Sequence, residues 1–253
     1  MKILNLASSS SGNCYIVEID TSKGAVVLML ECGLPYGEIL SKLNSERMQL
    51  SEIDFCFVSH CHNDHSQSLK AISNAGIKTF ASSDSKKRHG GRSINLKHLQ
   101  SVELVPGNIL LVTPIEVMHD EDTETFAFII ESDKESLLFI TDCLKFTNDL
   151  SQFKFDFIMV ECNYYQPQLF ARIKQLQDRG KAKEASQLIR VSKTHMSHRG
   201  TINVLKRLDL SRCSGILLIH LSDNNANEFR MKSEIVQAIQ KPVYIALKNG
   251  GIH

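Results

Sequence analysis

The segment SHCHNDH, residues 59–65, holds the densest group of side chains in this sequence that could do chemistry. Three histidines and one aspartate fall within six positions, at His60, His62, Asp64 and His65. Neutral imidazoles and carboxylates are ligands for Zn²⁺, Mn²⁺ and iron. His60 and His62 are two residues apart, so on an extended segment their side chains point the same way and can share one metal ion. Asp64 and His65 can then turn toward a second ion, and the segment therefore predicts a metal centre.

The elements around this segment place it on a loop between a strand and a helix. Residues 53–58 form a short apolar run typical of a buried strand, and residues 66–75 carry Leu69 and Ile72 at helical spacing. A loop held by a rigid scaffold can aim several side chains at one point. The alternative is a polar surface loop with unliganded histidines, and the density of potential ligands argues against it.

Three later polar residues end apolar, strand-like runs in a similar way: His119 after residues 109–118, Asp142 after residues 136–141 and His220 after residues 215–219. A lone histidine is usually structural, and an aspartate at a strand end is common in any protein. Glu161 and Tyr164 lie at the end of another apolar run, at residues 155–160. These polar strand ends indicate one common rim of the sheets.

Other stretches keep more than one interpretation. The turn at residues 8–13 is either a plain hairpin turn or a loop lining the pocket, with Ser9, Ser10 and Asn13 as candidate substrate contacts. The basic stretch at residues 82–97 is either a solvated face or an edge near a phosphate-bearing substrate; its His89, like His98 beyond it, is treated as an ordinary surface histidine. Residues 166–190 predict a long polar helical stretch with a break near Gly180. This stretch either caps the site, makes a dimer contact or lies on the surface.

The composition sets outer bounds. The chain has 253 residues, enough for one large α/β domain or two small ones, and its 42% hydrophobic and 23% charged residues are ordinary for a soluble globular protein. Seven cysteines without a CxxC pair favour reduced thiols and a cytoplasmic location. We find no signal peptide and no run long enough to span a membrane, so no membrane partner is expected. A net charge of +1 gives no overall attraction to nucleic acid, and the absence of tryptophan disfavours a stacking platform for single strands.

The pattern His60-x-His62-x-Asp64-His65 after an apolar strand resembles the signature of the metallo-β-lactamase fold superfamily, in particular its binuclear phosphodiesterase branch. The resemblance implies an α/β protein with an αββα sandwich of two mixed sheets and helices outside. Residues 1–253 would form one domain with halves at about 1–120 and 121–253. It implies seven metal ligands, with Asp142 bridging two ions: His60, His62, Asp64, His65, His119, Asp142 and His220. It also places an acidic residue that supports the metal loop at Glu31, where the superfamily usually has aspartate.

Five further stretches resemble two related groups: LASSSSGN (6–13), LECG (30–33), ECNY (161–164), HMS (195–197) and HLSDNN (220–225). The groups are the YycJ-type exonucleases of bacteria and the phage-type anti-Pycsar phosphodiesterases, both similar to ribonuclease Z. The resemblance implies hydrolysis of 3′,5′-cyclic nucleotides to linear monophosphates. The alternatives are a metal-dependent DNA or RNA nuclease and a non-enzymatic metal-binding protein.

The same resemblance implies roles for individual groups. Two Zn²⁺ ions, or Mn²⁺, would serve as cofactors, and Asp64 and His195 would be catalytic, with His198 as the alternative to His195. Ser197, His198 and Ser222 are further candidate substrate contacts. A homodimer is implied, in the cytoplasm, or in the host cytoplasm if the chain is phage-encoded.

Overall fold

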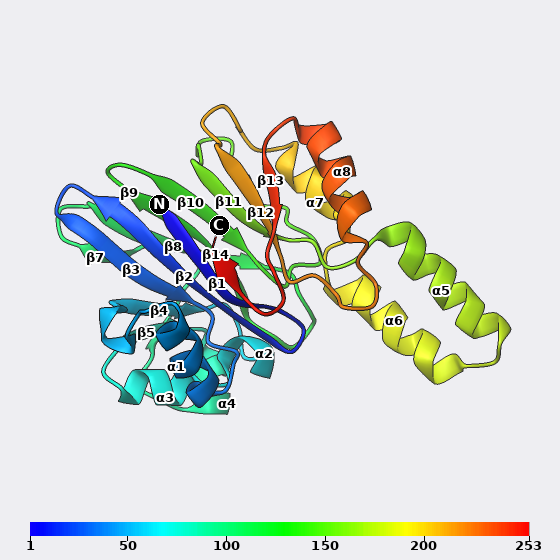
Figure 1. Cartoon of the computed structure of the whole chain (residues 1–253), viewed down its shortest axis with the longest axis horizontal. Helices are drawn as coiled ribbons and strands as arrows, with labels where there is room; N and C mark the ends of the chain where they lie inside the picture. Colours follow the sequence, from blue (N-terminus) through cyan, green and yellow to red (C-terminus); the bar gives the residue numbers. More distant parts are fainter. Residues whose placement is uncertain (253) are drawn as a thin grey trace.

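Alternating apolar residues bring two β-sheets together face to face in the computed structural model, which describes residues 1–252. In strand β2 (Gly12–Thr21), Tyr15, Val17 and Ile19 point into the layer between the sheets, while Cys14 points to the opposite face. The second sheet supplies the facing residues, including Phe128. The stacking order of helices, sheet, sheet and helices confirms the predicted αββα class (Figure 1).

Sheet A has seven strands, in the spatial order β14 (Gly251–Ile252), β1 (Lys2–Ser9), β2, β3 (Gly24–Leu30), β4 (Phe55–Val58), β5 (Lys78–Ala81) and β6 (Ile94–Asn95). Sheet B also has seven, in the order β13 (Val243–Ile245), β12 (Gly215–Ile219), β11 (Phe157–Glu161), β10 (Ser136–Ile140), β9 (Thr125–Ser132), β8 (Leu110–Val117) and β7 (Val102–Val105). In each sheet one half is antiparallel and the other parallel, so both sheets are mixed as expected.

Helices cover the two outer faces. The helices are α1 (Tyr36–Ser45), α2 (Asn63–Ser66), α3 (Leu69–Asn74), α4 (Ser83–His89), α5 (Gln166–Asp178), α6 (Ala182–Thr194), α7 (His198–Leu205) and α8 (Glu228–Ile239), with a short 3₁₀ helix at Leu50–Glu52. Ile39 of α1 and Ile72 of α3 pack on sheet A, whereas Leu205 of α7 and Ile235 of α8 pack on sheet B. No helix in residues 1–252 combines the length and the apolar character needed to cross a membrane.

Several predicted element limits are wrong. The single helix expected over residues 66–75 is two short helices, α2 and α3, because Ser68 donates its N–H to the Cys32 carbonyl at 3.0 Å instead of continuing a helix. Helix α2 also begins earlier than expected, at Asn63, inside the histidine segment. The strand expected over residues 53–58 is also shorter, since β4 covers only Phe55–Val58.

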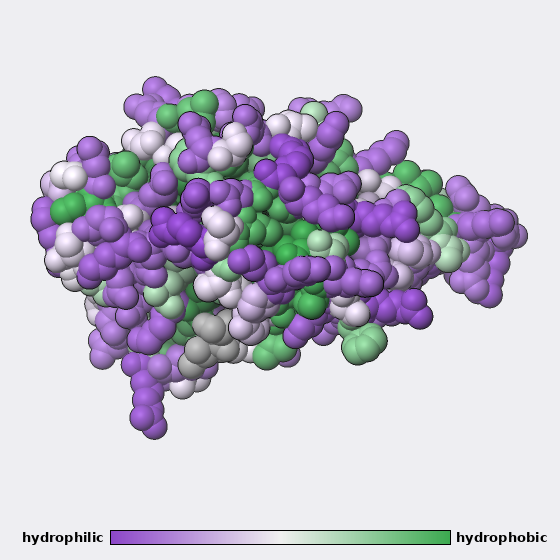
Figure 2. Space-filling view, turned by 90° about the horizontal axis from the view of Figure 1, so that it is seen from above, coloured by the Kyte–Doolittle hydropathy of each residue, from purple (hydrophilic) through white to green (hydrophobic). Residues whose placement is uncertain are grey.

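Helices α5 and α6 form a hairpin that projects from the body of the molecule (Figure 1). The predicted break near Gly180 is confirmed, since this glycine has φ of 69°, a conformation that favours glycine. Leu169 and Ile173 of α5 pack against Leu188 and Ile189 of α6. The tip of this arm is mainly hydrophilic (Figure 2).

Candidate metal centre

Four of the predicted ligands lie just after the C-terminal ends of strands, and two others, Asp64 and His65, lie in helix α2. His60 follows β4, His119 follows β8, Asp142 follows β10 and His220 follows β12. Strands β10, β11 and β12 are parallel, and β8 runs in the same direction as β10 because both are antiparallel to β9. Their C-terminal ends therefore share one edge of sheet B, the usual position of sites in such sheets.

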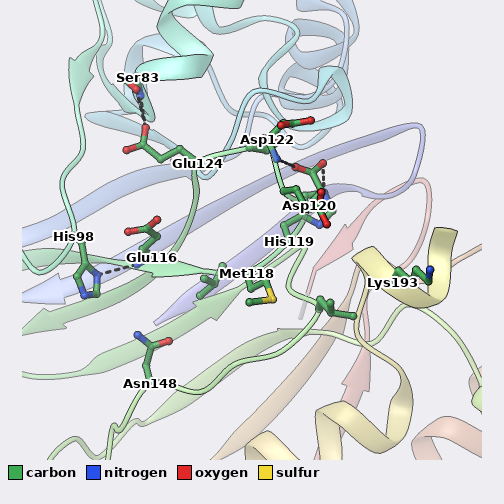
Figure 3. A pocket seen from close by; sticks show the side chains of 14 residues that line it. Ser83, His98, Glu116, Met118, His119, Asp120, Asp122, Glu124, Asn148 and Lys193 are labelled. Carbon is green, nitrogen blue, oxygen red and sulfur yellow. Dashed lines mark hydrogen bonds and ion pairs between the residues drawn. The ribbon is translucent and has the colours of Figure 1, made fainter.

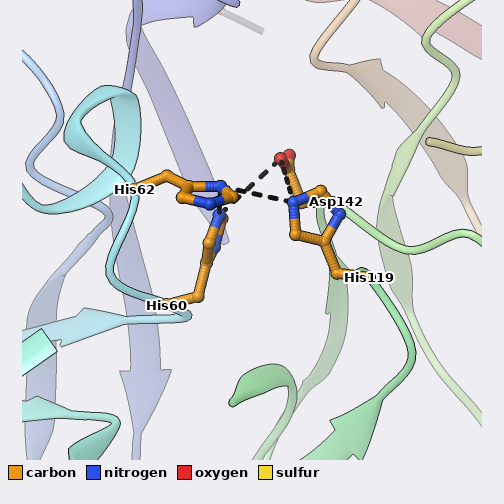
Figure 4. Close-up of side chains that lie close together, drawn as sticks. All are labelled: His60, His62, His119 and Asp142. Atoms are coloured by element: carbon orange, nitrogen blue, oxygen red, sulfur yellow. Dashed lines mark hydrogen bonds and ion pairs between the residues drawn. The ribbon is translucent and has the colours of Figure 1, made fainter. Parts of the chain in front are cut away.

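One group of candidate ligands consists of His60, His62, His119 and Asp142 (Figure 4). His62 Nδ1 lies 3.0 Å from His60 Nε2 and 3.3 Å from His119 Nε2. Asp142 Oδ2 lies 3.7 Å from His60 Nε2 and 3.5 Å from His119 Nε2. Four ligand atoms thus converge on one point.

A second group consists of Asp64, His65 and His220, joined by the other oxygen of Asp142. Asp64 Oδ2 lies 3.4 Å from His65 Nε2 and 3.3 Å from His220 Nε2. Asp142 Oδ1 lies 3.2 Å from each of these two nitrogens. Asp142 therefore presents one oxygen to each group, as a bridging carboxylate does.

These separations fit divalent metal ions. Zn²⁺ bonds of about 2.0–2.1 Å in a tetrahedron place the ligand atoms about 3.3 Å from one another. The measured separations within the two groups, 3.0–3.7 Å and 3.2–3.4 Å, bracket that value. The structure thus brings together all seven residues expected as ligands; their binding of metal stays a prediction.

Each candidate histidine also presents its second ring nitrogen to a polar group of the protein. The contacts are Ser59 Oγ with His60 Nδ1 (2.9 Å), the Thr194 carbonyl with His119 Nδ1 (2.7 Å), the Asn163 side-chain amide with His220 Nδ1 (3.0 Å), Glu31 Oε2 with His65 Nδ1 (3.5 Å) and Asp120 Oδ2 with His62 Nε2 (3.5 Å). The contacts of His60, His119 and His220 are hydrogen bonds, which fix the ring orientation and tautomer of a metal ligand. The two carboxylate contacts at 3.5 Å are ion-pair distances, and His65 Nδ1 has no hydrogen-bond partner within residues 1–252. Sequence reasoning found only Glu31 among them.

Glu31 lies where the sequence placed it, under the histidine loop. Its carboxylate is fully buried and accepts the N–H of Ser59 at 3.1 Å. Burial raises the pKa of Glu31, and its contact with His65 opposes that shift. Its longer side chain therefore reaches both the backbone and a histidine of the loop.

Three residues at this edge adopt a left-handed backbone without being glycine. The φ angles are 64° at Glu31, 37° at Asp142 and 56° at His220. Each follows the end of a strand and turns its side chain toward the cluster. This conformation costs an L-residue roughly 1–2 kcal/mol and is found preferentially at functional sites.

The pKa shifts of the clustered histidines and carboxylates favour binding of a cation. Burial holds the pKa of His60 and of His62 below the usual value, which keeps both rings in the neutral form that binds metal. Burial also disfavours protonation of His65, but the Asp142 and Asp64 carboxylates outweigh it and raise the pKa of His65 well above its usual range. A divalent ion would supply the positive charge that these carboxylates otherwise draw from a proton.

His195 forms a tight pair with Glu161 beside the two groups. His195 Nδ1 donates to Glu161 Oε1 at 2.7 Å, and burial of the His195 ring is outweighed by the Glu161 and Asp142 charges, which raise its pKa to about 9. Glu161 also accepts the backbone N–H groups of Cys143 at 2.8 Å and Met196 at 3.1 Å. Glu161 and His195 also lie close enough to Asp142 and His220 to share a metal ion with them. Because Glu161 already accepts hydrogen bonds from three donors of the protein, we interpret it as the group that orients His195.

Sequence reasoning left open whether Glu161 takes part in the site. The structure shows a fully buried carboxylate at the end of parallel strand β11, 34 residues before its partner His195. A charged residue that closes an apolar strand was the available signal. Its partner could not be named because the pairing depends on how β11 packs beside the loop after α6.

The six candidate substrate contacts do not share one position. They are Ser9, Ser10, Asn13, Ser197, His198 and Ser222. Only Ser10 lines the cavity over the metal ligands. Asn13 is buried and donates to the Asp64 carbonyl at 3.2 Å, while Ser197 caps α7 by accepting the N–H of Gly200.

The remaining three candidates hold protein segments together. Ser9 is buried and accepts the N–H of Ser11, and Ser222 accepts from Asn225 in the loop after His220. His198 is also buried: its Nδ1 accepts the N–H of Gln166, where α5 begins, and its Nε2 contacts Glu234 at 3.0 Å. His198 thus anchors the base of the arm, which makes His195 the histidine at the site. Substrate contact by any of the six stays a prediction.

A cavity of about 250 Å³ lies over the ligands. Asp64, Asp142 and His195 line one side of it, and residues of α6, including Arg190 and Thr194, line another. The C-terminal part of α6 therefore borders the site, while a dimer contact by the rest of residues 166–190 stays a prediction.

A larger acidic groove, of about 1080 Å³, adjoins this cavity at His119 (Figure 3). Its acidic lining residues are Glu116, Asp120, Glu121, Asp122 and Glu124. Lys193 of α6 faces them from the other side. The groove is therefore a poor path for a polyanion.

The basic stretch at residues 82–97 lies elsewhere. Of its residues, only Ser83 borders the groove, and none lines the metal cavity. The expectation that His89 is an ordinary surface histidine is wrong, because its Nε2 donates to the Cys61 carbonyl of the histidine segment at 2.8 Å. This hydrogen bond ties helix α4 to the histidine segment.

Gly33 is required by the close approach of the metal loop. A Cβ atom at this position would lie 1.7 Å from the carbonyl oxygen of Asp64. We expect Gly33→Ala to displace the loop, to destabilise the protein by about 3 kcal/mol or more, and to weaken metal binding. Thermal unfolding and metal titration measure these effects. The matched control is Gly37→Ala in α1, where a Cβ meets nothing within 4 Å; equal melting temperatures for the two variants would contradict the prediction.

The comparisons with known proteins agree with this geometry. The sequence profile described as the beta-lactamase superfamily domain matches residues 19–221. Curated protein sequences give no significant match. Solved structures share the fold: the metallo-beta-lactamase fold protein YhfI from Bacillus subtilis is 16% identical with a TM-score of 0.71, over 100% of this chain and 98% of that one.

Two other structures are similar over the full chain. Human tRNase Z, short form, is 15% identical with a TM-score of 0.63, covering 100% of this chain and 98% of its own. Zn²⁺-bound PqqB from Methylobacterium extorquens is 14% identical with a TM-score of 0.66, covering 100% and 99%. With a profile match over most of its length, the chain belongs to the beta-lactamase superfamily and is a metal-dependent hydrolase of the metallo-β-lactamase fold.

Proposed function

We propose that this protein is a binuclear metal-dependent phosphodiesterase that hydrolyses 3′,5′-cyclic nucleotides to linear monophosphates, and so destroys a cyclic-nucleotide immune signal. The observation that carries the proposal is Asp142, whose two carboxylate oxygens each face a separate group of ligand atoms at 3.2–3.7 Å. Two adjacent ions are the arrangement that clamps both the attacking and the leaving oxygen of a phosphodiester. Zn²⁺ is the proposed metal, with Mn²⁺ as the alternative.

The roles of the protein groups follow from their positions. When bound, the ions lower the pKa of a coordinated water and polarise the phosphoryl oxygens. Asp64 borders the cavity and orients the attacking water through its carboxylate. The Glu161 and Asp142 charges raise the pKa of His195 to about 9, so the ring is protonated on both nitrogens at neutral pH. Nδ1 donates to Glu161, and Nε2 donates its proton to the 3′-oxygen as the bond from phosphorus to that oxygen breaks.

Two features support a small substrate. The cavity of about 250 Å³ is near the lower end of ligand pockets, which span roughly 300–1,000 Å³. The groove that continues from it past His119 is lined by five carboxylates. A nucleic-acid strand laid along that groove would be repelled, whereas a cyclic mononucleotide does not need it.

A metal-dependent DNA or RNA nuclease is the second candidate, and the charge of the arm favours it. Residues 166–194 contain seven lysines and arginines against two acidic residues, although the whole chain has a net charge of only +1. A basic projection beside the site could hold the phosphates of a longer strand. One of the similar structures is named as a tRNase Z.

The deciding experiment compares hydrolysis of 3′,5′-cyclic mononucleotides with that of linear DNA and RNA by metal-loaded protein, with Asp64→Ala as the inactive control. Rapid opening of the cyclic ring with little cleavage of polymers is expected. Cleavage of polymers with the ring untouched would make the protein a nuclease. Metal binding without turnover on either class would leave a non-enzymatic role.

Residues 1–253 are proposed to act as one domain, in a homodimer in the cytoplasm. Light scattering after size-exclusion chromatography tests the dimer, and a single species at the monomer mass of 28.4 kDa would exclude it.

A further inference from the structure

Helix α6 has two distinct faces. Leu188 and Ile189 pack against α5 and fix the helix in place. Gln187, Arg190 and Thr194 line the metal cavity, at spacings of three and four residues. Because residues three and four apart share one side of a helix, this is one continuous wall.

Arg190 is the charged residue of this wall. Its side chain is exposed, and its guanidinium makes no hydrogen bond or ion pair with any other residue in the described range 1–252. By contrast, the guanidinium groups of Arg207 and Arg212 are engaged: Arg207 donates to the Phe146 carbonyl at 2.7 Å, and Arg212 binds Asp156. Arg190 thus brings a free fork of N–H donors to a cavity that contains Asp142 and His195.

We propose that Arg190 binds the non-bridging phosphate oxygens of the substrate, and that α6 is the recognition wall of the site. A guanidinium matches phosphate oxygens with two parallel hydrogen bonds, which an ammonium group does not do. The metal ligands lie on the sheet side of the cavity, so the phosphate would be held between them and α6. The identity of the anion as a phosphodiester rests on the proposed function; the presence of an anion-binding arginine does not.

The test is calorimetric binding of two probes, inorganic phosphate and a nucleoside 5′-monophosphate, to metal-loaded protein. Arg190→Ala should weaken both by about 10- to 100-fold, the range for a lost charge-assisted pair. Arg190→Lys should recover part of the loss, because it restores the charge without the fork. The matched control is Lys183→Ala, an exposed cation of the same helix that lines neither the metal cavity nor the groove.

Each outcome decides the matter. Weaker binding in Arg190→Ala, with unchanged metal content and with Lys183→Ala equal to the wild type, supports the assignment. Wild-type affinity for both probes in Arg190→Ala overturns it, as does an equal loss in Lys183→Ala. The binding readout needs no turnover, so it separates this inference from the proposed function, which fails instead if wild-type protein cleaves no phosphodiester.

Discussion

Replacing Asp142 by asparagine is expected to abolish activity by disrupting both ligand groups at once. Asp142 is buried, and its oxygens lie 3.2 Å from His65 and His220 and 3.5 Å from His119. Asparagine keeps the shape but removes the negative charge that joins the two groups. Turnover should fall at least about a thousandfold, the scale on which the loss of a central catalytic group acts.

Metal content gives the independent readout for this variant. Elemental analysis should show fewer bound ions per chain in Asp142→Asn than in the wild type. Added Zn²⁺ at about 100 times its dissociation constant should stabilise wild-type protein by about 2.7 kcal/mol and the variant by much less. Asp178→Asn, on the exposed side of α5, removes one carboxylate far from the ligands and serves as the control. Full metal content and activity in Asp142→Asn would refute the bridging role.

His195→Ala is expected to lower turnover by about 10²- to 10⁴-fold, the usual contribution of a general acid, and to leave the metal content unchanged. The reason is the 2.7 Å bond between His195 Nδ1 and Glu161, which directs the other ring nitrogen to the cavity. Kinetics and elemental analysis on the same preparation measure the two effects. Loss of metal in His195→Ala would make this histidine a ligand instead, and full activity would remove it from the mechanism.

The Glu161→Gln variant tests whether Glu161 acts by orienting the His195 ring, as distinct from the proton donation by His195 itself. Glutamine keeps the volume of the side chain but has one acceptor oxygen for three donors, His195 Nδ1 and the N–H groups of Cys143 and Met196. Turnover should therefore fall less than in His195→Ala. In the double variant the two losses should not add, because both act through one hydrogen-bonded pair. Additive losses would show that Glu161 acts independently of His195.

The apolar strands were predictable because a strand that is buried on both faces consists of consecutive apolar residues, and such a run is visible in the sequence. The run at residues 215–219, for example, was assigned with the limits that strand β12 has. Element limits failed where a tertiary contact overrode local preference. At Ser68, for example, a bond to the Cys32 carbonyl interrupts an otherwise helical stretch.

The partners that hold the ligands were less predictable. The Thr194 carbonyl contacts His119 Nδ1, although the two residues are 75 positions apart in the chain. The Asp120 carboxylate contacts His62 Nε2. A backbone carbonyl of a threonine and an aspartate in a loop have no sequence pattern that would identify them as partners of a metal ligand. Their roles arise only when separate loops pack against one another.

The sequence by itself determined the apolar strands and the ligand character of residues 60–65, because apolar runs and the spacing from His60 to His65 are local properties of the chain. The αββα class and the later ligands His119, Asp142 and His220 came from the family resemblance that these local motifs carry. Only the tertiary structure decided that Glu161 holds His195, that α6 places Arg190 over the ligands, and that an acidic groove adjoins His119. The physical reason is that each of these depends on distances between segments far apart in the chain, and those distances are set by how the two sheets and the arm pack together.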